Sequence, residues 1–110
     1  MEAEKLKVSK TGSEELRMFL DGRIDGNTSE NIQKQAVEAI ENEEIESFVF
    51  DVNGVTYVSS AGLRMFSGIS GLCRSKGIDY CLDGLREDMM RMFQLTGYAN
   101  IFKINVRQDV

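Results

Sequence analysis

Two neighbouring serines, Ser59 and Ser60, are the side chains best placed for chemistry in this sequence. They follow the apolar segment 55–58 and precede an amphipathic stretch that begins near Gly62. The first N–H groups of a helix lack internal partners and carry partial positive charge. A serine at this place can cap the helix, or it can be phosphorylated, because a dianion is well placed at a helix N-terminus. The residue types alone leave both interpretations open, and capping is the more ordinary one.

The chain contains no histidine, which excludes several kinds of catalysis. A nucleophilic serine needs an adjacent base, so a small hydrolase that uses Ser60 is rejected, and the GxSxG elbow of such enzymes is also missing. Zinc sites of the usual His/Cys type lack their ligands. Neither a P-loop nor a glycine-rich dinucleotide motif occurs. We therefore expect no enzyme activity, no metal and no cofactor.

The charge and the apolar runs restrict the partners. The 13 Lys and Arg residues against 18 Asp and Glu residues give a net charge of −5, which argues against binding to nucleic acid or to an anionic membrane. No apolar run approaches the ~20 residues of a membrane helix, and the charged N-terminus is unlike a signal peptide. Cys73 and Cys81 lack CxxC spacing and are expected to be small buried hydrophobes in a reducing compartment. These features predict a cytoplasmic protein without membrane insertion.

Hydrophobic periodicity predicts a single α/β domain over residues 1–110, with the element order β-β-α-β-α-β-α-β. A leading hairpin followed by alternating units implies a mixed, mostly parallel sheet with helices packed on it. Turns are expected at Gly12-Ser13 and Asn53-Gly54, a loop at 21–26 and fraying at 107–110. Asn27, Thr28 and Ser29 are candidate caps of the first helix, and Gly77 is the expected end of the second. The expected strands are 4–10, 15–20, 47–52 with its extension 55–58, 78–82 and 101–106; the expected helices run over about 27–41, 62–76 and 86–96.

The stretch from Asp51 to Leu63 resembles the signature of the STAS superfamily. It has an aspartate-led strand, a turn, an extended segment and then Ser-Ala-Gly-Leu opening a helix. Three further segments are similar to the family in the same order: the Gly-Arg-Ile-Asp loop at 22–25, the helix-ending Gly77, and the Leu-Thr-Gly within 92–97. The resemblance spans nearly the whole chain.

In stand-alone bacterial members of this family, the serine two positions before the Gly-Leu pair is phosphorylated, so the resemblance implies that Ser60 is the acceptor. The family often has aspartate immediately before it, where this chain has Ser59, which stays the alternative acceptor. The implied function is that of an anti-sigma factor antagonist. Its unphosphorylated form would capture an anti-sigma factor serine/threonine kinase and free a sigma factor, and a separate phosphatase would restore it. The alternative is a STAS subunit of a transport or stress-signalling assembly.

The resemblance also implies a partner-binding surface around the acceptor. Asp25 has a second interpretation, as a turn residue that caps the first helix. Gly68 and Gly71 weaken the second helix relative to alanine, and either close approach by a partner or dense internal packing would explain them. The implied partner-binding residues are Asp25, Asn27, Thr28, Ser59, Ser60, Gly62, Leu63 and Arg64.

Overall fold

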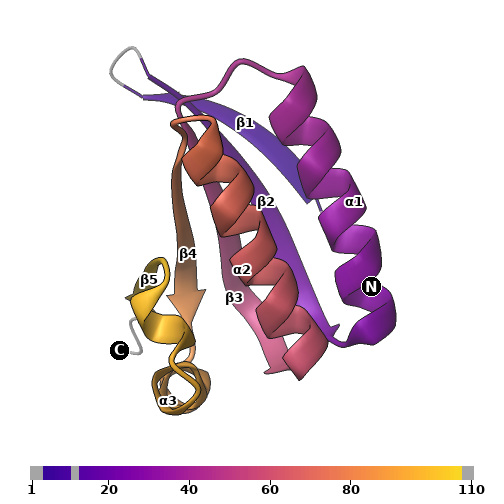
Figure 1. Cartoon of the computed structure of the whole chain (residues 1–110), viewed down its shortest axis with the longest axis vertical. Coiled ribbons are helices and arrows are strands. Elements are labelled where there is room, and N and C mark those ends of the chain that lie inside the picture. The colour runs from indigo at the N-terminus through magenta and orange to yellow at the C-terminus, as the bar shows by residue number, and fades with distance from the viewer. Residues whose placement is uncertain (1–3, 11–12, 108–110) are drawn as a thin grey trace.

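Parallel strands and one antiparallel edge strand form the sheet in the computed structural model (Figure 1), which describes residues 4–10 and 13–107. The strand order is β1-β2-β3-β4-β5; β1 runs antiparallel to β2, and every later pair is parallel. The strands are β1 (Glu4–Lys10), β2 (Ser13–Ile24), β3 (Ser47–Val58), β4 (Asp79–Leu85) and β5 (Lys103–Val106). The helices are α1 (Gly26–Asn42), α2 (Ser60–Ser75), α3 (Glu87–Leu95) and the short 3-10 helix η1 (Tyr98–Asn100).

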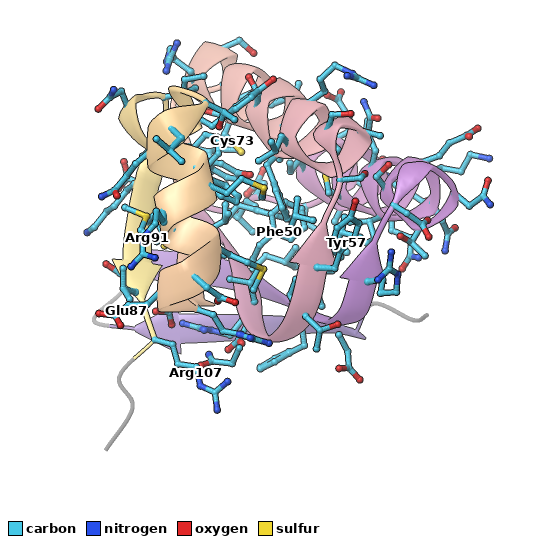
Figure 2. The ribbon with its side chains drawn as sticks, turned by 90° about the horizontal axis from the view of Figure 1, so that it is seen from below. Phe50, Tyr57, Cys73, Glu87, Arg91 and Arg107 are labelled. Carbon is cyan, nitrogen blue, oxygen red and sulfur yellow. The ribbon has the colours of Figure 1, made fainter. Side chains whose placement is uncertain are left out.

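The hydrophobic core lies between the sheet and the helices. Helices α1 and α2 lie side by side on one face, and α3 lies near the end of β4 (Figure 1). The core is built around fully buried aromatic rings, with Phe50 of β3 against Phe66 of α2 at a centroid distance of 5.4 Å, and Phe66 followed by Phe93 of α3 at 6.4 Å. Figure 2 shows Phe50 in this interior. Burying side chains of this size stabilises a fold by roughly 1.5–3 kcal/mol each, so the core holds α2 firmly on the sheet.

The predicted element order is confirmed, and so is the α/β class. The loop expected at 21–26 and the turn expected at Asn53-Gly54 are wrong. Strand β2 continues to Ile24, and β3 runs without a break to Val58. Their ends pair with each other, with Asp21 opposite Gly54 and Ile24 opposite Val58. Two register shifts, between Phe19 and Asp21 and between Gly22 and Arg23, compensate for the larger number of residues in this part of β3. Because most of these backbone groups have partners on the neighbouring strand, the polar residues that suggest turns stay within the strands, and Gly22 takes its positive φ of +77° at a register shift inside the strand pairing.

The predicted C-terminal end of α2 is confirmed, whereas its predicted start is wrong by two residues. Gly77 follows Lys76, the C-cap of α2, with a φ of +70°, as predicted for the end of that helix. The helix begins at Ser60, two residues before the predicted start. Gly12 of the predicted turn, and residues 108–110 of the predicted frayed end, lie outside the described residues. In the part of the chain that the structure describes, no helix has the length and apolar character needed to cross a membrane.

Candidate functional site

The ends of β2 and β3 bring the starts of two helices together. Both strands are parallel and end level with each other, with Ile24 opposite Val58. The Ser59 N–H donates to the Ile24 carbonyl oxygen across 2.8 Å, which joins the two strand-to-helix connections. As a result Asp25, which precedes α1, and Ser59, which precedes α2, lie next to each other at the same edge of the sheet. The N-termini of α1 and α2 both point out from this edge (Figure 1).

The two serines have different environments. Ser59 is the N-cap of α2: its Oγ accepts a hydrogen bond from the Gly62 N–H at 3.2 Å, and the residue is half-buried. Ser60 is the first residue of the helix and is exposed. Within residues 4–10 and 13–107, no group forms a hydrogen bond with the Ser60 hydroxyl. One serine therefore has the capping role, and the other has a free hydroxyl at a helix N-terminus.

Gly62 lets α2 start this close to the strands. A Cβ atom at this position would lie 2.9 Å from Ile24 Cγ2, 2.9 Å from Val58 Cγ1 and 3.1 Å from the Ile24 carbonyl oxygen. Carbon–carbon contacts are optimal at about 3.5–4.0 Å, so any other residue forces the helix away from the strand ends. Leu63 is also buried, in the core. Of the predicted partner-binding residues, these two thus support the site from inside and offer no side-chain surface.

The cap of α1 is Asp25, which confirms the second interpretation of this residue; Asn27, Thr28 and Ser29, the other candidate caps, lie inside the helix. Its carboxylate accepts hydrogen bonds from the Asn27 and Thr28 N–H groups, both at 3.1 Å. The Thr28 hydroxyl accepts a hydrogen bond from the Asp25 N–H at 2.8 Å, which completes a capping box. The Thr28 N–H is the main cause that lowers the pKa of Asp25, and the Thr28 hydroxyl, the Asn27 N–H and the charge of Arg23 act in the same direction. Asp25 is thus a fixed, ionised carboxylate beside Ser59.

The exposed and half-buried residues that these connections bring together form what we call the Ser60 surface. It is defined by Asp25, Asn27, Thr28, Ser59, Ser60 and Arg64, of which Asn27, Ser60 and Arg64 are exposed and the others are half-buried. Arg64 stands one helical turn after Ser60 on α2, where side chains four residues apart are neighbours. No three Asp, Glu or Cys side chains among the described residues are grouped as metal ligands would be.

Two exposed residues beside this surface were missed. Arg23 and Tyr57 are paired across β2 and β3, and the Arg23 guanidinium carbon lies 4.1 Å from the centre of the Tyr57 ring. They were missed because Arg23 was assigned to a loop, and the pairing of β2 with β3 was not known. Tyr57 already lies in the predicted strand extension 55–58, and the alternation of exposed Arg23 with buried Ile24 is the signal that could have placed Arg23 on a strand as well.

The face of α2 turned to solvent carries the two helical glycines. A Cβ atom at Gly68 or at Gly71 would meet no atom within 4 Å, and both residues are exposed. Dense internal packing, one of the two explanations considered, is therefore wrong. Close approach by a partner stays a prediction.

The fold and the site define an α/β domain that presents a helix start and a free hydroxyl on its surface. Residues 7–110 match the pattern of the STAS domain, and the chain belongs to this family. The anti-sigma-B factor antagonist of Listeria monocytogenes is 27% identical over 99 residues, which cover 90% of this chain and 86% of that protein.

Solved structures support the same assignment of the fold. The anti-sigma factor antagonist SpoIIAA in its unphosphorylated form matches with a TM-score of 0.66 at 15% identity, covering 97% of this chain and 89% of that one. The Bacillus cell fate determinant SpoIIAA in the phosphorylated form matches with a TM-score of 0.67 at 16% identity, covering 94% of this chain and 92% of that one.

Proposed function

We propose that this protein is an anti-sigma factor antagonist whose binding to an anti-sigma factor serine/threonine kinase is controlled by phosphorylation of Ser60. The observation that carries the proposal is the division of roles between the two serines. Ser59 is occupied as the helix cap, whereas the Ser60 hydroxyl is exposed and free at the start of α2. The relatives named anti-sigma factor antagonists, one of them solved in a phosphorylated form, support the antagonist function in this proposal.

The chemical step is a phosphoryl transfer that the partner catalyses. The Ser60 Oγ attacks the γ-phosphorus of the ATP held by the kinase. The bond between the γ-phosphorus and the β,γ-bridging oxygen breaks, and ADP leaves. The hydroxyl proton passes to a base on the kinase. A separate phosphatase reverses the modification with water and releases inorganic phosphate. The STAS domain supplies the acceptor and its position, and no catalytic group.

The position of Ser60 explains why the fold would tolerate the modification and the complex would not. A phosphoserine carries about −1.5 to −2 charges at neutral pH. At the first residue of α2 it gains from the unpaired N–H groups of the helix, and Arg64 lies one turn away. In the interface with a kinase the same charge would lose its water in a site shaped for a neutral hydroxyl, which costs binding free energy. Phosphorylation would therefore release the partner and leave the antagonist folded.

The test uses the purified protein and a recombinant anti-sigma factor kinase from the same genome. Ser60→Ala should bind the kinase as the wild type does and should not be phosphorylated by ATP in mass spectrometry. Ser60→Asp should stay folded and bind more weakly. Stoichiometric phosphorylation of Ser60→Ala would move the acceptor to Ser59, and an affinity of the wild type that is the same before and after phosphorylation would refute the switch. A wild-type protein that does not bind the kinase at all would refute the proposed function.

A further inference from the structure

An exposed arginine and an exposed tyrosine lie stacked at the strand ends beside the Ser60 surface. The Arg23 guanidinium carbon is 4.1 Å from the centre of the Tyr57 ring, and the tyrosine is 41% exposed. Each residue is two positions before a residue of the Ser60 surface, Arg23 before Asp25 and Tyr57 before Ser59. The pair therefore extends that surface from the helix starts onto the ends of β2 and β3.

Arg23 and Arg17 lie on the same strand, but only Arg17 is paired with carboxylates. Arg17 is neutralised within the fold, with nitrogen–oxygen distances of 3.0 Å to Asp51, 3.1 Å to Asp83 and 3.4 Å to Glu15. Among the residues that the structure describes, no carboxylate forms an ion pair with Arg23. Among the described residues, the side-chain contact of the guanidinium is the one with the ring, and the one side-chain hydrogen bond at Arg23 is accepted by its carbonyl oxygen, so the guanidinium N–H groups stay available to an acceptor. An acidic chain of net charge −5 thus presents a positive, oriented group beside the Ser60 surface.

We propose that Arg23, held on the ring of Tyr57, binds an acidic side chain of the anti-sigma factor kinase. This inference rests on the proposed function, and it adds a specificity contact outside the residues that the family resemblance implied. A carboxylate is the matching group because two of its oxygens can accept the parallel N–H groups of one guanidinium. The ring limits the rotation of the long arginine side chain before binding, so less conformational freedom is lost when the contact forms. Arginine and tyrosine are also the residue types that most often dominate interface energetics.

Phosphorylation of Ser60 would weaken this contact between Arg23 and the partner carboxylate. A phosphate at that position brings negative charge to the surface that a partner carboxylate must approach. Repulsion between the two, and competition for the positive groups of this surface, would both weaken the complex.

The experiment measures the Kd of the recombinant kinase for four variants by calorimetry, at low and at high salt. Arg23→Glu should weaken binding about tenfold or more, as expected for the loss of a central arginine contact. Tyr57→Leu, which keeps bulk and loses the aromatic face, should weaken it severalfold, and Tyr57→Phe should bind as the wild type does. Arg91→Glu is the control for the change in net charge, because Arg91 is exposed on α3, on the other side of the view from Tyr57 in Figure 2. The loss in Arg23→Glu should shrink at high salt, where exposed charges are screened over a few ångströms.

Several outcomes decide between the two proposals. Wild-type affinity in Arg23→Glu, with the wild type itself binding, would overturn the contact and leave the proposed function intact. Equal weakening in Arg23→Glu and Arg91→Glu would also overturn it, because the effect would then come from net charge alone. Thermal unfolding of each variant identifies any that has lost its fold; in that case Arg23→Gln, which removes the charge with less strain, takes the place of Arg23→Glu.

Discussion

Replacing Gly62 with alanine tests how closely α2 is held against the strand ends. The added methyl group would lie 2.9 Å from Ile24 Cγ2 and from Val58 Cγ1, and 3.1 Å from the Ile24 carbonyl oxygen. The two methyl groups belong to buried side chains, and the oxygen belongs to backbone that is already bonded to the Ser59 N–H at 2.8 Å. None of these atoms can retreat without moving the core or the strand, so we expect the start of α2 to shift outward.

The magnitude follows from two opposing terms. An extra carbon in a well-packed site costs about 1–3 kcal/mol. Alanine is preferred over glycine in a helix by up to about 1 kcal/mol, which offsets part of this cost. With a steric cost of about 2 kcal/mol, the middle of that range, and an offset of about 1 kcal/mol, Gly62→Ala should destabilise the protein by about 1 kcal/mol. With a urea m-value of about 1–3 kcal/mol per molar for a small protein, the unfolding midpoint should fall by roughly 0.3–1 M.

Two other glycines on the same helix provide matched controls in urea unfolding. An added Cβ at Gly68 or at Gly71 would meet no atom within 4 Å, so only the helix preference acts there. Gly68→Ala and Gly71→Ala should each raise the free energy of unfolding by up to about 1 kcal/mol, and the urea midpoint should rise accordingly. If Gly62→Ala is as stable as the wild type, or gains as the controls do, the steric reasoning about this contact is wrong. Reduced phosphorylation of Ser60 in Gly62→Ala, with no such loss in the controls, would show that the shifted helix start also changes the acceptor.

Two further predictions concern pH. Hydrogen bonds, chiefly from the Thr28 N–H, lower the pKa of Asp25 in the folded state, so its contribution to stability is present above the unfolded-state pKa and is lost as the pH falls through the folded-state pKa. Asp25→Ala should lower the urea midpoint at neutral pH and converge with the wild type in acid, whereas Asp25→Asn keeps a cap oxygen and stays near the wild type; a gap that is constant down to strong acid would contradict this. Burial raises the pKa of the Cys73 thiol to about 11, above the unfolded value of about 8.5, so its contribution is complete below the unfolded value and is lost as the pH rises to the folded one. As the pH rises from the unfolded-state pKa of Cys73 to its folded-state pKa, the free energy of unfolding should fall less in Cys73→Ala than in the wild type. Equal slopes of unfolding free energy against pH would refute the raised pKa of Cys73.

The sequence by itself determined the order of the elements and placed two serines beside the start of the second helix. Apolar residues at helical spacing, alternating apolar residues and glycines at the ends of elements are patterns that depend on neighbours within a few positions. These patterns correctly predicted the three α-helices, the sheet and the end of α2 beside Gly77. The same patterns placed Ser59 and Ser60 just before the second helix, within two residues of its observed start. Such features need no knowledge of what lies across the sheet.

Only the tertiary structure decided where β2 and β3 end and which residues meet there. Their last residues are extended because each strand satisfies the other's backbone groups, as Ile24 and Val58 do, and no local pattern contains that pairing. The same pairing places Asp25 beside Ser59 and stacks Arg23 on Tyr57. It also explains Gly62, whose neighbours in space are 38 and 4 positions earlier in the chain. Contacts between residues far apart in sequence depend on the packing of whole elements, which is why the charge and shape of the surface around Ser60 became visible only in the fold.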